Sequence, residues 1–257
     1  MMVNFQKFIE SKRVYAALAV LLVLIIVLTL ELLKNPKNEL AEQYKLESTK
    51  LQEQQINPIN FQKLTAVNSD VCAWIHIPGS EEAYGAAIDY PILQSSREKP
   101  EDFYLNHDTY GKSSKDGSIY IQKFNHNNFS DYNTVIYGHD LANKQMFTPL
   151  RKYRNRDFFD KNQYIYIYLP DRLLKYHIFA AFVHSDSHLL YEYDFNDEDS
   201  CGEFLSECEN PASKTGNYRK EANVTTEDRL ITLSTCTSNK GERFLVVALL
   251  SEEIIYK

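Results

Sequence analysis

Hydrophobic residues dominate one long segment near the start of the chain. Residues 14–33 are apolar except for Thr29 and Glu31. A helix that spans a membrane needs roughly 17–25 such residues, whereas a secretory signal peptide has a core of about 7–15 followed by a small-residue cleavage site. Because no such site follows this segment, the pattern predicts an uncleaved transmembrane anchor. A cleaved signal peptide is the alternative.

Basic residues beside this segment indicate its orientation. Lys7, Lys12 and Arg13 precede the apolar run, whereas Lys34 and Lys37 follow it. This slight excess of positive charge before the run predicts a cytoplasmic N-terminus, residues 1–13. We therefore expect a single-pass protein of the cell membrane, with its globular part on the extracytoplasmic face.

Beyond the apolar run the pattern changes twice. Residues 34–58 are polar and rich in Glu, Lys and Gln, which predicts a helical stalk. Residues 59–257 contain short runs of β-branched and aromatic residues separated by turn residues, which predicts a mainly β domain with short helices. The predicted strands are Val71–Ile77, Ala87–Gln94, Ser118–Gln122, Thr134–Tyr137, Tyr164–Leu169, Leu173–Val183, Leu230–Thr235 and Arg243–Leu249. Many short strands of this kind are typical of a closed or partly closed barrel.

Two stretches of this domain depart from the strand pattern. Phe147–Tyr153 is a candidate for one or two helical turns. Residues 187–223 form a long, acidic insertion that is poor in strand signals and has a helical pattern around Glu203–Ser206. Long connections in compact domains are usually functional, so we expect this insertion to contribute to the site.

Composition narrows the possible partners and the role of cysteine. The net charge of −7 argues against nucleic acid as a partner. Cys201 and Cys208 are seven residues apart in the helical stretch. Two helical turns separate Cα atoms by roughly 10 Å, which is too far for a disulfide. We therefore interpret these two cysteines and Cys72 as free, partly buried thiols.

Cys236 has different neighbours from the other cysteines. It follows the predicted strand Leu230–Thr235, and Arg243 opens the next strand seven residues later. A short turn between two neighbouring strands brings their ends to the same point. The sequence therefore places a candidate nucleophile beside a fixed positive charge.

A cysteine nucleophile needs a partner that holds or moves a proton, and this is usually histidine. Of the seven histidines, His139 follows a short apolar strand at a Gly138 turn, where a positioned catalytic side chain is expected. His184 and His188 flank Asp186 and could in principle bind a metal, but a loop pair without a third ligand is more often plain surface. His139 is therefore a candidate for the base, and the spacing alone leaves the choice of base open; we predict no metal site.

These residues resemble the signature of the sortases, a family of cysteine transpeptidases. Thr232–Cys236 with Arg243 is similar to the family's T-L-x-T-C…R motif, and Tyr137–His139 is similar to its histidine motif. An N-terminal anchor with an external domain is the family's usual layout. The finer features resemble class B sortases: Asp89–Gln94, Gly117–Tyr120, Val135–His139, Met146–Phe147 and the long insertion. One position departs from the class, because Asp140 stands where Asn is expected.

The resemblance implies a fold and a reaction. Residues 59–257 would form a catalytic sortase domain with a closed, eight-stranded β-barrel. Cys236 would attack a C-terminal sorting motif of a secreted protein and form a thioester, while His139 would move the proton. Arg243 would bind the peptide carbonyls or the oxyanion. An amine of a cell-wall peptide, or of a pilin subunit, would then take the acyl group, and no cofactor is needed.

Some assignments stay open at this level. Ser234, Thr235 and Tyr137 are candidate substrate-binding residues, although packing alone would also explain residues of a strand. By analogy with class B sortases, the insertion would form one wall of the substrate groove. Two other functions remain possible, namely an anchored cysteine protease that hydrolyses peptides and a non-catalytic surface binding module.

Overall fold

The computed structural model describes residues 56–257 of the chain. The predicted cytoplasmic segment 1–13, the predicted anchor 14–33 and most of the predicted stalk 34–58 lie outside the described residues. Over residues 56–257, no helix is long and apolar enough to cross a membrane.

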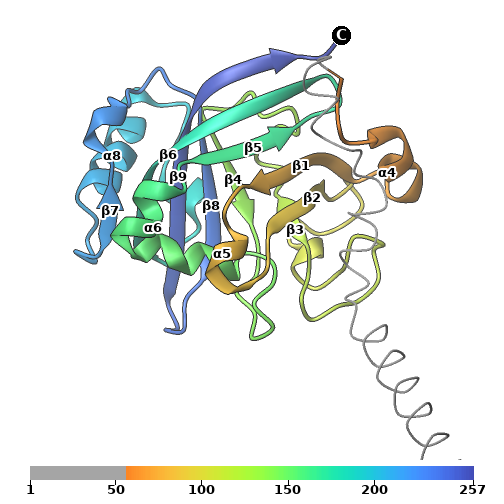
Figure 1. The fold of residues 1–257 in the computed structure, drawn as a ribbon, viewed down its shortest axis with the longest axis horizontal. Coiled ribbons are helices and arrows are strands. Elements are labelled where there is room, and N and C mark those ends of the chain that lie inside the picture. The colour runs from red at the N-terminus through yellow and green to blue at the C-terminus, as the bar shows by residue number, and fades with distance from the viewer. Residues whose placement is uncertain (1–55) are drawn as a thin grey trace, which may run out of the picture. The chain divides into compact units, whose positions relative to one another are not determined.

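The described residues are organised around one continuous sheet (Figure 1). Its nine strands follow the order β5-β1-β2-β3-β4-β8-β9-β6-β7, and an additional pairing of β5 with β6 closes the eight strands other than β7 into a barrel. The strands are β1 Val71–Ile77, β2 Ile88–Gln94, β3 Ile119–Ile121, β4 Asn133–Tyr137, β5 Tyr164–Tyr168, β6 Arg172–Ser185, β7 Gly216–Tyr218, β8 Leu230–Cys236 and β9 Glu242–Ile255.

Short helices connect the strands. They are α4 Phe61–Val67, α5 Glu81–Tyr84, η1 Phe103–Leu105, η2 Thr148–Arg154, α6 Arg156–Lys161, α7 Leu189–Glu192, α8 Glu198–Glu209 and η3 Lys220–Ala222. The longest, α8, is preceded by the N-cap residue Asp197, whose side chain accepts a hydrogen bond from the Ser200 backbone N–H over 3.0 Å. Such an N-cap satisfies a backbone donor that has no partner inside the helix.

The mainly β fold and the closed eight-stranded barrel predicted from the sequence are confirmed. The prediction missed β7, which lies inside the insertion and pairs with β6. Its sequence, Gly216-Asn217-Tyr218, has no hydrophobic alternation, so the strand depends on the neighbour it joins. The prediction also ended β9 too early, because the polar end of this strand pairs with β6 as far as Ile255.

Two hydrophobic clusters lie on opposite faces of β6, β8 and β9. The inner cluster fills the barrel and includes Phe244 and Val246 of β9. The outer cluster includes their neighbours Leu245 and Val247, together with Phe204 of α8. The insertion therefore covers the outer face of these strands, which Figure 1 shows as α8 and β7 beside β6. Burial on both faces explains why β6 has an unbroken apolar run from Ile178 to Val183.

Candidate active site

Pairing between β4 and β8 determines where the predicted base and nucleophile meet. The two strands are parallel, and Tyr137 of β4 lies opposite Ser234 of β8. The Gly138 backbone N–H continues the ladder by donating to the Ser234 carbonyl over 3.2 Å. Two residues beyond this register pair come His139 on one chain segment and Cys236 on the other. Parallel register therefore carries both side chains to the same end of the sheet.

Antiparallel pairing places Arg243 beside Cys236. The two residues are direct register partners across β8 and β9. Side chains that oppose each other in an antiparallel pair project from the same face, with Cβ atoms about 4.5–5.5 Å apart. The turn between them is fixed by Glu242, whose carboxylate accepts hydrogen bonds of 3.1 Å from Thr237 Oγ1 and Asn239 Nδ2.

Backbone contacts on the far side of the ring orient His139. Its Nε2 lies 2.6 Å from the carbonyl oxygen of Leu105 at the end of η1. Because a carbonyl only accepts, Nε2 carries the hydrogen, and Nδ1 is the nitrogen that can exchange a proton in the neutral ring. Gly117 backs this contact, since a Cβ built there would meet Leu105 O at 2.5 Å and His139 Cδ2 at 3.0 Å.

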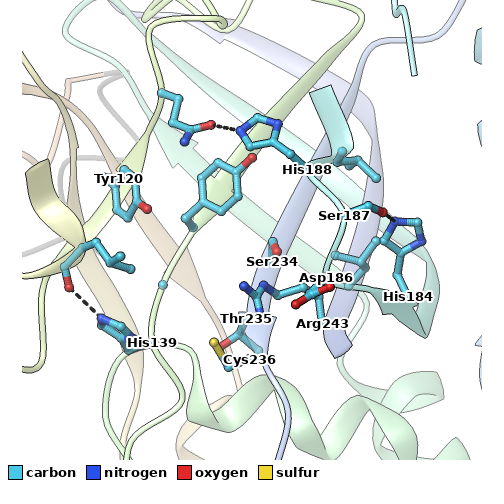
Figure 2. Close-up of a pocket in the computed structure, with 16 residues that line it drawn as sticks. Tyr120, His139, His184, Asp186, Ser187, His188, Ser234, Thr235, Cys236 and Arg243 are labelled. Atoms are coloured by element: carbon cyan, nitrogen blue, oxygen red, sulfur yellow. Dashed lines mark hydrogen bonds between the residues drawn. The ribbon is translucent and has the colours of Figure 1, made fainter. Parts of the chain in front are cut away.

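The three side chains surround one pocket of ≈ 200 Å³. Figure 2 shows Cys236 between His139 on one side and Arg243 on the other. The predicted substrate-binding residues Ser234, Thr235 and Tyr137 also line this pocket, as do Ser187, His188 and Leu189 at the start of the insertion. The structure thus brings together every site residue predicted from the sequence, and the insertion supplies one wall.

Comparison with known proteins agrees with this geometry. The family model described as "Sortase domain" matches residues 83–251. The chain belongs to the sortase family. It is 33% identical to "Sortase B" of Listeria monocytogenes over 177 residues, which cover 69% of this chain and 67% of that protein.

Solved structures give the same result. The chain is 30% identical to Clostridium perfringens sortase B, with a TM-score of 0.65 over 75% of this chain and 100% of that one. A structure titled "Staphylococcus aureus sortase B-substrate complex" is 27% identical, with a TM-score of 0.69 over 84% of this chain and 95% of that one. The resemblance to class B sortases is therefore confirmed, and the chain is a member of a cysteine transpeptidase family.

Two pocket residues of this sortase carry buried hydroxyl groups that no described residue satisfies. These groups are the Tyr137 hydroxyl and Thr235 Oγ1. Tyr137 stacks on Tyr120 with ring centroids 5.4 Å apart, and burial raises the pKa of both phenols. Both therefore stay neutral, and each hydroxyl keeps a proton to donate. A buried donor without a partner is unfavourable, so these hydroxyl groups are suited to donate to polar groups of a ligand.

The interpretation of His184 and His188 as a surface pair was wrong for His184. His184 lies in β6, is 5% exposed and contacts Glu207 of α8. His188 has a different partner, because its Nε2 donates to Gln122 Oε1 over 2.8 Å. The error arose because β6 continues to Ser185, beyond the predicted end at Val183. Within the described part of the chain, no group of three His, Cys, Asp or Glu residues could hold a metal.

The other three cysteines lie in surroundings that disfavour the thiolate form. All four cysteines of the chain lie in the described region and are free thiols, which was the prediction for Cys72, Cys201 and Cys208. Burial raises the pKa of Cys72 to about 12 and also raises the pKa of Cys201 and Cys208. Since the thiolate is the reactive species, these three thiols are poor nucleophiles.

Asp140, which departs from the class B pattern, has a partner of its own. Its carboxylate is 2% exposed and pairs with the guanidinium of Arg151 in η2. The same loop is closed by a hydrogen bond of 2.9 Å from the Phe147 backbone N–H to the His139 carbonyl. Asp140 therefore ties the loop after His139 to η2, and its charge is balanced by Arg151.

Sequence reasoning missed several pocket residues of this sortase. Leu105 contributes a backbone carbonyl, which leaves no trace in side-chain identity. Gln122 also lines the pocket but stands in no recognisable motif, and Asp186 was considered only with the possible metal pair His184 and His188. Tyr120 belongs to the stretch Gly117–Tyr120, which carried part of the class B resemblance, so this position had a signal although no role was assigned to it.

Proposed function

We propose that this sortase is a membrane-anchored transpeptidase that uses Cys236, His139 and Arg243 to transfer an acyl group from a sorting motif to an amine. The observation that carries the proposal is the convergence of β4, β8 and β9, which gathers a thiol, an imidazole and a guanidinium around one pocket. The anchor is the apolar segment 14–33, and the catalytic domain faces the cell wall.

The first step forms an acyl enzyme. The Cys236 thiolate attacks a peptide carbonyl of the sorting motif, so that an Sγ–C bond forms and the carbonyl oxygen becomes an oxyanion. The C–N bond then breaks, and protonated His139 gives its proton to the leaving amine. Nδ1 is the nitrogen that exchanges this proton, because Nε2 is held by the Leu105 carbonyl.

The second step transfers the acyl group. A neutral amine of a cell-wall peptide, or of a pilin subunit, attacks the thioester carbon and loses a proton to His139. The new C–N bond forms as the Sγ–C bond breaks, and the thiolate is regenerated. A thioester is far more reactive toward amines than an amide is, so transfer needs no further energy source.

Arg243 stabilises the charge that develops between these steps. Its planar guanidinium donates to an oxyanion or to two peptide carbonyls at once. Tyr137 and Thr235 offer the unsatisfied hydroxyl groups described above, and Ser234 completes the same edge of the pocket. These three residues are proposed to bind the backbone of the sorting motif.

Amine-dependent product formation tests the proposed function. The full chain is incubated with peptides from a library of C-terminal sorting motifs, with and without triglycine as acceptor. We expect cleaved peptide joined to triglycine as the main product. Release of hydrolysed peptide alone, unaffected by triglycine, would instead identify a cysteine protease. An absence of cleavage across the library would favour the non-catalytic binding module.

Arg243→Lys is expected to lower kcat/KM by roughly 10²-fold or more, the range for loss of an oxyanion donor. Lys keeps the charge but loses the planar fork. The loss should appear in kcat as well as in KM, because the oxyanion exists only on the way to the intermediate. Steady-state kinetics with triglycine and a peptide that the wild-type chain cleaves measure both constants.

A matched control separates this effect from general loss of charge. Arg229 lies at the other end of the β8–β9 pair, where its guanidinium contacts Glu253 over 2.7 Å. Arg229→Lys is expected to keep near wild-type kinetics. Unchanged kcat in Arg243→Lys would remove Arg243 from the catalytic machinery and leave a Cys–His pair.

A further inference from the structure

The side chain of His184 links the insertion to β6, the strand that pairs with the Arg243 end of β9. His184 of β6 lies directly opposite Arg243 of β9, which in turn lies opposite Cys236 of β8. The three residues therefore form one row across the outer face of the sheet. At the end of this row, the His184 side chain is 3% exposed and contacts Glu207 of α8. Figure 2 shows it beside Ser187.

Both ring nitrogens of His184 face carboxylates from different helices. Nδ1 lies 2.8 Å from Glu207 Oε1 of α8, and Nε2 lies 3.3 Å from Glu192 Oε2 at the end of α7. A neutral imidazole has only one N–H and would turn a lone pair toward one of these carboxylates. A doubly protonated ring donates to both, so the geometry favours the imidazolium.

The other charged and polar groups around the ring fit this assignment. Tyr193 donates to Glu207 Oε2 over 2.8 Å, and Ser187 Oγ contacts Glu192 and lies 3.4 Å from His184 Nε2. Among cations, Arg243 is the register neighbour on β9, and its Nη1 donates to the Glu242 carbonyl over 3.3 Å. Both carboxylates therefore have His184 as their basic partner from the barrel.

Burial alone would lower the pKa of His184. The hydrogen bond and charge of Glu207, joined by the charge of Glu192, outweigh burial and raise the pKa of His184 above its usual value. Burial likewise opposes the charge of Glu207, but the bonds from His184 and Tyr193 lower the pKa of that carboxyl. A histidine with a raised folded-state pKa stabilises the fold below its unfolded pKa, and this stabilisation is lost as pH rises through the folded pKa.

We propose that His184 is a positioning residue that holds the insertion, as a wall of the peptide site, against the barrel through Glu192 and Glu207. The segment between β6 and α7 is short and includes Ser187 and His188, which line the catalytic pocket. Fixing α7 and α8 to β6 therefore fixes this part of the wall. The role in peptide binding rests on the proposed function, whereas the role in holding the insertion does not.

Hydrogen exchange followed by mass spectrometry tests the clamp without any substrate. In the full chain, His184→Gln should lower the protection of amides in 186–209 by at least roughly 10-fold while the strands of the barrel keep theirs. In the wild-type chain, the protection of 186–209, corrected for intrinsic exchange, should fall as pH rises above about 6.5, the ordinary pKa of histidine, and through the raised folded-state pKa. In His184→Gln that pH dependence should be absent.

Kinetics then test whether the clamp serves peptide binding. His184→Gln should raise KM for a substrate peptide by roughly 10-fold and change kcat by less than about 3-fold. The substitution displaces the insertion that lines the pocket and leaves the reacting groups in place. Glu207→Gln, which keeps the histidine, should act in the same direction and provides the test if His184→Gln does not fold. His126→Gln is the matched control, since it removes an exposed histidine that lies 2.6 Å from Asp131.

Several results would overturn the proposal. Unchanged protection of 186–209 in both His184→Gln and Glu207→Gln, or the same pH dependence in His184→Gln as in wild type, would show that no such clamp exists. A loss in kcat at constant KM would place His184 in the chemistry instead of the wall. If the wild-type chain turns over no peptide, the proposed function fails, yet the exchange experiment still decides whether His184 holds the insertion.

Discussion

Cys236→Ala is expected to abolish peptide cleavage and transfer, with a loss of at least about 10³-fold, because the proposed reaction has no path that avoids the thioester. The fold should survive the change. Cys236 is the last residue of β8 and is only partly buried, so replacing its thiol with hydrogen leaves the inner core of the barrel intact. Cleavage assays measure the loss, and circular dichroism reports on the fold.

A second cysteine provides the matched control for this change. Cys72→Ala removes a thiol that lies in β1 and outside the catalytic pocket, so this variant should keep near wild-type activity. A thiol-reactive probe should also label Cys236 faster than Cys72, Cys201 or Cys208, since burial raises the pKa of those three thiols. Retained cleavage by a folded Cys236→Ala chain would contradict the mechanism.

His139→Ala is expected to be nearly as damaging, with a fall in kcat of about 10²–10⁴-fold, the usual contribution of a general acid–base. The His139 ring gives a proton to the leaving amine and later takes a proton from the incoming amine. The Leu105 carbonyl and the backbone at Gly117 position the ring. Because both are backbone groups of other segments, a substitution at 139 should leave the residues that line the pocket in place. A scan of all seven histidines, with kcat and KM measured separately, tests this assignment.

The other histidines of the pocket sharpen the test. His184 and His188 line the same pocket, but both rings are engaged, with carboxylates in one case and with Gln122 in the other. Their substitutions should act mainly on KM. A loss in kcat at His184 or His188 equal to that at His139 would show that the base has been misassigned.

Local patterns in the sequence were sufficient to place the strands that carry the candidate site. The strand pattern of Leu230–Thr235 and the short turn to Arg243 predicted a strand pair, and the structure has Cys236 and Arg243 as register partners. The likeness of Thr232–Cys236 and Tyr137–His139 to family motifs then linked segments that are far apart in the chain. Without that likeness, nothing local indicates that β4 and β8 pair in parallel, because their pairing is long-range.

Features that depend on tertiary contacts could not be predicted. β7 has no hydrophobic alternation and exists as a strand because β6 offers it an edge. His184 looked like a loop residue because polar Ser185 and Asp186 follow it, whereas pairing with β9 extends β6 to include it. The contact of His139 with Leu105 uses a backbone carbonyl, which any residue at position 105 would provide.

The mass of the intact chain during turnover tests the central claim most directly. The full chain is mixed with an intact sorting-motif peptide that it is known to cleave, in the absence of amine. The mixture is quenched in acid and analysed by mass spectrometry. We predict an adduct equal to the N-terminal fragment of the peptide, located on Cys236, which disappears with formation of joined product when triglycine is added. Cleavage without an adduct on Cys236, or an adduct that triglycine does not discharge, would contradict a transpeptidase that works through this thiol.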